Sequence, residues 1–138
     1  MLFLFADAVA KKVEYFAATN TKKVQRFKGP GTNYPLMHIL SQKNYPVKVI
    51  GEFDNWCRVL CVDGELGWIK KCYLSTKYRR AITIKNTHLY DGASNHSRTI
   101  AQLHKNVFVQ IKSTKGEFAY VMVGEKRLKG FVPLKDLW

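Results

Sequence analysis

Three cysteines carry the most reactive side chains in this chain. Cys57 and Cys61 are four residues apart in "CRVLC", and Cys72 follows eleven residues later. The close pair has the spacing of a zinc knuckle, but no second close pair completes a set of four ligands. In a strand the two would lie about 13 Å apart, whereas a disulfide requires Cα atoms within about 7 Å, so only Cys72 can pair with one of them. Buried reduced thiols are the default expectation, with no metal site and no cofactor.

Other catalytic arrangements have little support in the sequence. Nucleophilic catalysis requires a serine or cysteine beside a base, and neither a Gly-x-Ser-x-Gly turn nor a comparable cysteine signature is present. Two acidic pairs fall in predicted turns, where solvated carboxylates are expected: Glu52 with Asp54, and Asp63 with Glu65. The histidines have no metal-ligand spacing and are expected on the surface: His38, His88, His96 and His104. We therefore expect that the protein is not an enzyme.

The stretch "KGPGTNYP", residues 28–35, is the remaining candidate for phosphate chemistry. A Walker-type phosphate loop needs G-x-x-x-x-G-K-[ST] between a strand and a helix, and this stretch has neither that spacing nor a helix after it. We interpret it as a structural loop in which Gly29 and Gly31 have positive φ and Pro30 fixes a bend. Because loops on a rigid scaffold also carry binding residues, we expect Tyr34 to be exposed beside a groove.

Composition and charge indicate a globular protein with basic character. The 138 residues are 46% hydrophobic and 13% aromatic, and the net charge is +13. Such a charge favours anionic partners, but the basic residues are spread over both halves of the chain, so the charge does not name a partner. No segment approaches the run of about 18 apolar residues that a membrane span requires, so none is expected.

The chain contains an internal repeat. "NWCRVLCVDGELGWIKKCYL", residues 55–74, aligns with "EFAYVMVGEKRLKGFVPLKDL", residues 117–137, at offsets of 62 and then 63. A repeat of this length indicates two copies of one small fold. The aligned positions are Trp56 with Phe118, Val59 with Val121, Gly67-Trp68-Ile69 with Gly130-Phe131-Val132, and Gly29 with Gly92.

Each copy has the pattern of a small all-β unit. "PVKVIGEF" and "VFVQIK" alternate apolar and polar residues, as in a strand with one buried face. Asp63-Gly64 joins two such runs and predicts a tight hairpin turn, whose counterpart runs from Gly124 to Lys129. Helix is expected only as a 3₁₀ turn at "KKCYL" or "VPLKDL". The expected core residues are Val59 and Trp68 in the first copy, and Val121 and Phe131 in the second.

These residues resemble the bacterial SH3-like domain family. "VQRFKGPGTNYPLMHIL", "EFDNWCRVL" and "GELGWIKKCYLS" follow the family pattern through nearly the whole first copy, in the order that the family uses. The second copy lacks Pro-Gly and both tryptophans, so we interpret it as divergent. The resemblance implies the all-β fold class, with two small SH3-like β-barrels in tandem. We place domain 1 at residues 16–75 and domain 2 at residues 80–138, with a division in the polar stretch "STKYRR".

The start of the chain, "MLFLFADAVAKK", favours export. Met1–Phe5 is apolar, and Ala6-Asp7-Ala8 has the small-x-small form of a signal-peptidase site, so residues 1–15 are interpreted as the remnant of a signal peptide. A basic beginning is missing, and an ordinary terminus is the alternative. Members of the family are commonly secreted or periplasmic, so the resemblance implies that location, with the cytoplasm as the alternative.

Aromatic residues are the best candidates for ligand binding. Alternation places Trp56 on the face opposite Val59, and Phe118 holds the same place in the second copy, so both rings are expected to be partly exposed. The candidate groove for a peptide or glycan comprises Tyr34, Trp56, Tyr73 and Phe118. Packing of these rings between the two barrels is the alternative. Because Ser97 aligns with Tyr34, the second copy is expected to bind less well than the first.

The resemblance implies a noncatalytic binding module for a peptide, a cell-wall glycan or peptidoglycan, and the positive charge adds an acidic protein surface as a third partner. The alternative is a cytoplasmic basic module that binds nucleic acid, which the charge and interleaved aromatics favour but no nucleic-acid motif supports. Spread positive charge also predicts weak, nonspecific and salt-dependent binding to polyanions such as DNA or heparin.

Overall fold

A computed structural model describes residues 10–138, which form two compact units. Unit 1 runs through Lys77 and unit 2 comprises Tyr78–Trp138, so the division falls inside "STKYRR". Most of the stretch interpreted as a signal-peptide remnant, residues 1–9, lies outside the described residues, whereas residues 11–15 belong to the first strand. None of the described segments is a helix long and apolar enough to cross a membrane.

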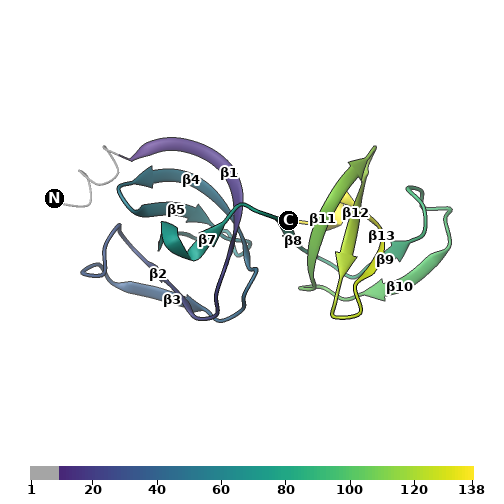
Figure 1. Ribbon diagram of the computed structural model, residues 1–138, viewed down its shortest axis with the longest axis horizontal. Helices are drawn as coiled ribbons and strands as arrows, with labels where there is room; N and C mark the ends of the chain where they lie inside the picture. The colour runs from purple at the N-terminus through teal and green to yellow at the C-terminus, as the bar shows by residue number, and fades with distance from the viewer. Residues whose placement is uncertain (1–9) are drawn as a thin grey trace. The chain divides into compact units, whose positions relative to one another are not determined.

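Unit 1 is a seven-stranded antiparallel sheet in the order β3-β2-β6-β5-β4-β1-β7 (Figure 1). A 3₁₀ turn, η1 (Lys71–Tyr73), lies between the sixth and seventh strands of this unit. The strands are β1 (Lys11–Thr19), β2 (Val24–Phe27), β3 (Leu36–Leu40), β4 (Pro46–Phe53), β5 (Trp56–Leu60), β6 (Leu66–Lys70) and β7 (Leu74–Ser75).

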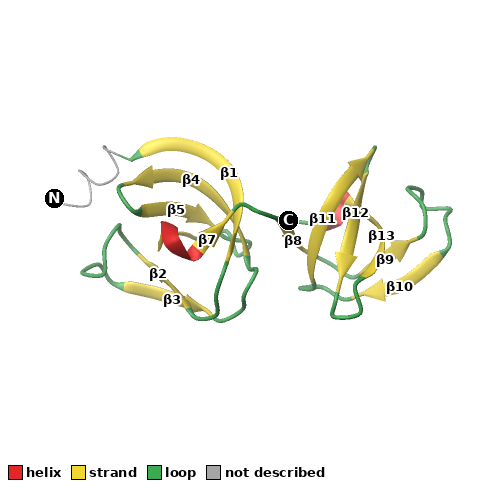
Figure 2. Cartoon of the chain, viewed as in Figure 1, coloured by secondary structure: helices red, strands yellow, loops and turns green. Residues whose placement is uncertain are grey.

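Unit 2 repeats this sheet with six strands in the order β10-β9-β13-β12-β11-β8. Its strands are β8 (Arg79–Ile82), β9 (Thr87–Tyr90), β10 (Thr99–Leu103), β11 (Phe108–Lys115), β12 (Phe118–Val123) and β13 (Leu128–Pro133). The second 3₁₀ turn, η2 (Leu134–Asp136), follows β13, and Figure 2 shows the two turns as the only helical segments among the described residues. The predicted all-β class, the division into two similar units and both 3₁₀ turns are confirmed.

The repeat extends to a threonine clamp that the sequence alignment had not included. The Thr19 hydroxyl donates to the carbonyl of Gln42 and accepts from the amide of Tyr45, at 3.0 and 2.9 Å. Thr83 makes the same two hydrogen bonds, with the carbonyl of His104 and the amide of Val107, at 2.7 and 2.8 Å. Both threonines are buried, so each clamp fixes the start of a long central strand to the first strand of its unit.

Alternation along β5 and β12 produces two faces with different roles. Val59 and Cys57 point into the core of unit 1, where both are fully buried. Trp56 and Arg58 lie on the opposite face and are partly buried. Trp68 is 3% exposed, but Val59 pairs with Gly67, so Trp68 lies on the outer face and not beside Val59 in the core. Both residues are buried, as expected. The expectation that Trp68 packs with Val59 in the core is wrong, because Trp68 lies on the opposite face of the sheet.

The turns follow the sequence in one case and depart from it in another. Gly64 has φ +82° and closes the β5–β6 hairpin, as Asp63-Gly64 predicted. Gly29 and Gly31 do not have positive φ, so that expectation is wrong. A Cβ on Gly29 would lie 2.2 Å from Cδ1 of Tyr34. Glycine is required there because the tyrosine ring packs directly onto the backbone.

Candidate functional site

An aromatic row on the outer face is the first part of the candidate site. Trp56 opens β5, and its ring meets Phe27 edge to face with 5.7 Å between centroids. Phe27 pairs across strands with Trp68. The half-buried state of Trp56 agrees with the partial exposure that alternation predicted. Its role in binding stays a prediction.

The same row recurs in unit 2, with two corrections to the sequence analysis. Phe118 opens β12 and meets Tyr90 edge to face at 6.2 Å. Tyr90 pairs with Phe131, which in turn packs against Tyr120 at 5.0 Å. Phe118 is only 8% exposed, so the expectation that its ring is partly exposed is wrong. Phe131 is half-buried, less than its expected place in the core requires.

Each 3₁₀ turn is tied to the hairpin that begins with the aromatic residue. The amide of Lys71 donates to the carbonyl of Asn55 at 2.7 Å, and the amide of Leu134 donates to the carbonyl of Glu117 at 2.9 Å. Asn55 and Glu117 each precede the aromatic residue that opens the strand. The hydrogen bond therefore holds the 3₁₀ turn against the base of the aromatic row in both units.

In unit 2 this arrangement borders a cavity of about 320 Å³, which we name the corner pocket. Phe118 and Pro133 supply buried apolar surface, and Leu134 at the rim is 36% exposed. Side chains of opposite charge, Glu117 and Lys135, are both exposed. The complete lining is Asn95, Gly116, Glu117, Phe118, Pro133, Leu134 and Lys135. Apolar walls with a few polar groups at the rim are typical of ligand sites.

The two tyrosines predicted for the groove lie on different elements. Tyr34 is half-buried in the loop between β2 and β3, where its ring packs on Gly29. Tyr73 lies on η1 and is 41% exposed. Ser97 occupies the place of Tyr34 in unit 2, since a Cβ on Gly92 would lie 2.7 Å from its hydroxyl oxygen. The structure thus confirms the alignment of the two loops, while the binding roles of both tyrosines stay predictions.

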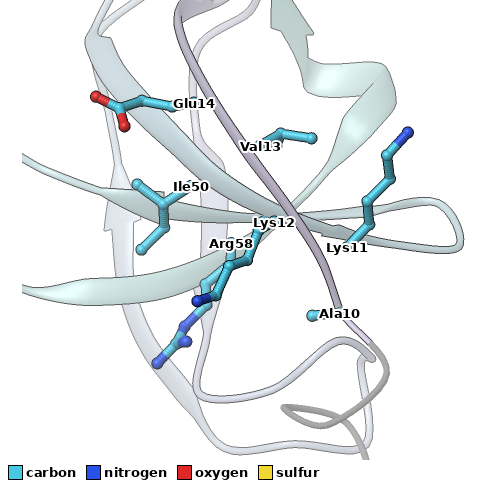
Figure 3. A pocket seen from close by; sticks show the side chains of 8 residues that line it. Ala10, Lys11, Lys12, Val13, Glu14, Ile50 and Arg58 are labelled. Atoms are coloured by element: carbon cyan, nitrogen blue, oxygen red, sulfur yellow. The ribbon is translucent and has the colours of Figure 1, made fainter.

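Two further cavities lie away from the corner pocket. One, of about 560 Å³, borders the first half of β1 in unit 1 (Figure 3). The other, of about 210 Å³, is lined in part by His88 and His104. His88 is half-buried and its Nδ1 atom lacks a hydrogen-bond partner, so the surface position expected for this histidine is wrong. Within residues 10–138, no group of three or more His, Cys, Asp or Glu is placed to hold a metal ion.

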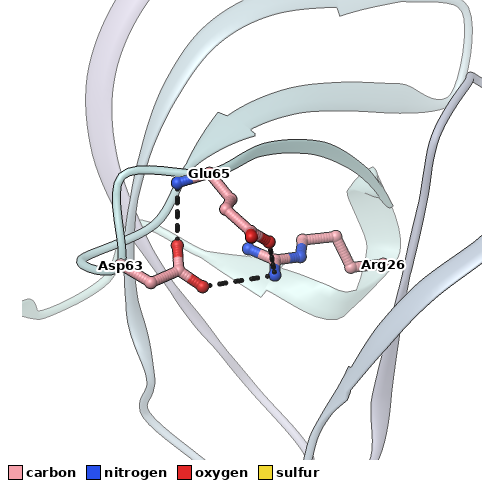
Figure 4. A network of polar contacts seen from close by, with 3 residues as sticks. All are labelled: Arg26, Asp63 and Glu65. Atoms are coloured by element: carbon pink, nitrogen blue, oxygen red, sulfur yellow. Dashed lines mark hydrogen bonds and ion pairs between the residues drawn. The ribbon is translucent and has the colours of Figure 1, made fainter.

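A buried arginine accounts for one of the two acidic pairs. Arg26 is 1% exposed, and its Nη2 atom lies 3.3 Å from Asp63 Oδ2 and 3.3 Å from Glu65 Oε2 (Figure 4). Asp63 Oδ1 also accepts from the amide of Glu65, which fixes the turn. The interpretation of this pair as solvated acids is therefore incomplete. Alternation with buried Val24 and the alignment of Arg26 with Leu89 are the signals that would have placed Arg26 inside.

Glu52 lies in β4, is half-buried and joins a small hydrogen-bonded network, so its expected place as a solvated acid in a turn is wrong. Its Oε2 atom accepts from the Tyr15 hydroxyl at 2.7 Å and pairs with Lys71 Nζ at 3.2 Å. Hydrogen bonds from Tyr15 and Lys71 hold the pKa of Glu52 below its ordinary value. Burial and the hydrogen bond to Glu52 raise the pKa of Tyr15. Each group thus stays in its ordinary ionisation state at neutral pH, which suits a structural contact better than proton transfer.

The cysteines are free thiols in different surroundings. Cys57 and Cys61 are buried, and burial raises the pKa of both thiols. Cys72 lies on η1 and is exposed, so the expectation of a buried thiol is wrong at this position. Only Cys72 is placed to meet a reagent from solvent.

Comparison with known proteins identifies the first unit. The sequence model of the family described as the bacterial SH3 domain matches residues 21–76. Residues 21–76 form a bacterial SH3 domain. Unit 2, which lies outside that match, has the same strand order and so the same SH3 topology. No curated protein sequence matches the chain.

Solved structures that match in the comparison include two NlpC proteins and a putative autolysin. NlpC2 and NlpC1 from Trichomonas vaginalis have 18% and 16% identity and TM-scores of 0.41 and 0.40, over 92% and 91% of this chain. A putative autolysin from Listeria monocytogenes has 15% identity and a TM-score of 0.35, over 94% of this chain. The matches cover 48%, 46% and 64% of those three chains, so the present chain spans about half to two thirds of their length.

Proposed function

We propose that the protein is a noncatalytic, exported binding module that holds a peptide-bearing fragment of the cell wall in the corner pocket of unit 2. The corner pocket is the observation that carries this proposal. It combines an aromatic floor, Phe118, with an apolar wall, Leu134, and exposed charges of both signs. A wall peptide carries free amino and carboxyl groups, which Glu117 and Lys135 can pair with while its aliphatic parts contact Leu134.

The elements around the pocket suit binding without catalysis. The backbone of the 3₁₀ turn is fixed to the hairpin by the Leu134–Glu117 hydrogen bond, and Pro133 restricts the residue before it. A pocket on such a fixed frame loses little conformational freedom when a ligand enters. The preferred site thus lies at Phe118 in the second copy, and not at Trp56 and Tyr34 in the first.

Binding of the full chain to a soluble disaccharide-peptide fragment of peptidoglycan tests the proposal by titration calorimetry. Leu134→Ser and Asn95→Ala each remove one contact at the rim, and we expect each to weaken binding by about tenfold, the effect of losing roughly 1–2 kcal/mol. Ile100→Ser is the matched control, because Ile100 is 39% exposed in the same unit and does not line the pocket.

The result separates the proposal from its competitors. Unchanged affinity in both rim variants overturns the corner pocket as the site, and binding of the sugar without its peptide overturns the peptide as the ligand. A nanomolar complex with a nucleic acid of defined sequence at physiological salt favours the cytoplasmic alternative. In the wild-type chain, turnover of the fragment overturns the noncatalytic assignment.

A further inference from the structure

Unit 1 contains a second candidate ligand site, on the part of β1 that precedes the family match. A cavity of about 560 Å³ opens there between β1, β4 and β5, as Figure 3 shows from close by. We name it the basic cleft, since its charged lining comprises three basic residues and one acidic residue. The complete lining is Ala10, Lys11, Lys12, Val13, Glu14, Ile50, Gly51 and Arg58.

The cleft is built around a glycine that stands between two cations. Gly51 of β4 pairs with Lys12 on β1 and with Arg58 on β5. Residues paired in this way project from the same face of a sheet, so Lys12 and Arg58 flank a position that has no side chain. Their Cα atoms lie about 10 Å apart, twice the spacing between strands. Gly51 itself is buried, and a Cβ there would lie 3.9 Å from Ala10 Cβ, so a ligand group would have to sit above the glycine, between the ends of the two charged side chains.

Two strand irregularities coincide at this place. The register between β1 and β4 shifts between Lys12 and Tyr15, and the register between β4 and β5 shifts between Val49 and Gly51. Both shifts lie beside Ile50, which lines the cleft. Bulges of this kind bend strands and re-aim side chains, and they recur next to functional sites.

The nearby carboxylates are already engaged. Glu14 pairs with Lys48 at 2.7 Å, and that hydrogen bond lowers the pKa of Glu14, so it stays ionised. Glu52 is held by Tyr15 and Lys71, and Lys11 also contributes to the lowering of its pKa. Lys12 and Arg58 have no ion pair with any described residue. Two positive charges therefore border the cleft without a protein counter-charge in residues 10–138.

Unit 2 shows that the SH3 topology does not require this cleft. Its first strand, β8, pairs with only four residues of β11 and has no counterpart of the Lys11–Tyr15 half of β1. The repeat places Ser113 opposite Tyr120 where unit 1 has Gly51 opposite Arg58. The glycine and both cations are thus particular to unit 1.

We propose that the basic cleft binds the phosphate group of a phosphorylated sugar between Lys12 and Arg58. The planar guanidinium of Arg58 matches two phosphate oxygens, and the ammonium of Lys12 supplies a second charge from the other side. Val13 and Ile50 give the cleft apolar surface against which a sugar ring packs. No aromatic residue is among the described residues that line it, so nucleobases have no stacking platform.

The test uses the full chain and glucose 6-phosphate as the probe, followed by NMR chemical shifts. Arg58→Gln and Lys12→Gln each remove one charge-assisted contact, and each is expected to weaken binding about tenfold or more. The matched control, Lys126→Gln with Lys129→Gln, removes exposed charges from unit 2 and is expected to change affinity less than about twofold.

A steric variant tests the gap independently of charge. A Cβ on Gly51 would lie 3.4 Å from Arg58 Cβ and 3.6 Å from the Lys11 carbonyl, which are ordinary contacts. Gly51→Val is therefore expected to fold, as checked by amide NMR, and to block the phosphate. If Gly51→Val unfolds, the two charge variants still decide the question.

Other probes identify the source of the phosphate and the competing outcomes. Glucose without phosphate should not bind, and inorganic phosphate should bind more weakly than the sugar phosphate. Equal losses in the cleft variants and the unit 2 control would overturn the site, because spread charge then explains the binding. Tighter binding of single-stranded DNA would overturn the sugar. Cleft variants should bind the peptidoglycan fragment as the wild type does, so this proposal and the corner pocket fail separately.

Discussion

Replacing Arg26 by leucine should leave unit 1 as stable as the wild type or more so. Arg26 is buried, and only its Nη2 atom has acidic partners, both at 3.3 Å. Its Nε and Nη1 atoms are buried without an oxygen acceptor, and the buried Cys61 thiol beside the guanidinium is only a weak acceptor. Unit 2 shows that leucine fits. A Cβ added to Gly67 would lie 2.5 Å from Arg26 Cγ, and a Cβ added to Gly130 would lie 2.7 Å from Leu89 Cγ, so the two side chains cover their glycines in the same way.

The magnitude follows from comparing what the substitution removes. A buried donor that lacks a strong acceptor costs about 1–3 kcal/mol, and Arg26→Leu removes both Nε and Nη1. The ion pairs lost are to Asp63 and Glu65, whose side chains are 46% and 63% exposed; pairs of this kind contribute about 0–1 kcal/mol each. We therefore expect a gain of about 1–4 kcal/mol in the free energy of unfolding, the range found when buried ion pairs are replaced by packed apolar residues.

Two further variants are expected to be less stable than the wild type. Arg26→Ala leaves a cavity over Gly67 and should cost about 2–4 kcal/mol. Combining Asp63→Asn with Glu65→Gln keeps the buried guanidinium but removes its counter-charges, which should cost about 3–5 kcal/mol. Breaking the pair from the acidic side is thus expected to be much more harmful than replacing the arginine.

Urea unfolding followed by tryptophan fluorescence measures these differences. Trp56 and Trp68 report on unit 1, and a Trp138→Phe background removes the tryptophan of unit 2. The expected order of stability is Arg26→Leu at or above wild type, then Arg26→Ala. A loss in Arg26→Leu as large as that in Arg26→Ala would refute the reasoning, because the ion pairs would then contribute more than the packing that replaces them.

Three other predictions concern the thiols, the acid range and the overall charge. Iodoacetamide should modify Cys72 quickly in the native chain, and Cys57 and Cys61 only after unfolding, as mass spectrometry would show. The pKa of Glu52 is lowered in the folded state, so its contribution to stability is present above the ordinary carboxylate pKa and is lost as pH falls through the folded value. Tyr15→Phe should raise the pKa of Glu52 in a carbon-13 NMR titration. It should also make the free energy of unfolding fall less steeply as the pH is lowered. Heparin binding should weaken steeply between low and physiological salt, and a salt-independent complex would contradict it.

Much of the fold could be predicted from alternation, turn residues and the repeat. Val59 and Val121 are fully buried, as the period-2 pattern required, and Gly64 has the positive φ that a hairpin turn favours. These features are local: each depends on a few neighbouring residues and on the periodicity of a strand. The same pattern placed Trp56 correctly on the outer face, where it is half-buried.

The features that the sequence analysis missed depend on contacts between distant residues. Arg26 was missed because a charged residue is expected outside, and only the packing against Gly67 and the aspartate of the next hairpin makes its burial tolerable. The glycine at position 29 was explained by a positive φ, but it is required because the ring of Tyr34 packs against its backbone. Phe118 was expected to match the exposure of Trp56, yet it is 8% exposed at the edge of the corner pocket. Equivalent positions in a repeat share backbone geometry, while burial depends on neighbours that the two copies do not share.

This difference between backbone and side chains explains how one fold offers two kinds of surface. Both units keep the threonine clamp and the link from the 3₁₀ turn to the hairpin, which are made largely by backbone groups. The side chains that do not take part in those bonds differ between the two units. Where unit 1 has Arg58 beside Gly51, unit 2 has Tyr120 packed on Phe131. Unit 1 thus has a charged side chain at the place where unit 2 extends its aromatic row, so ligands of different chemistry are expected at the two units.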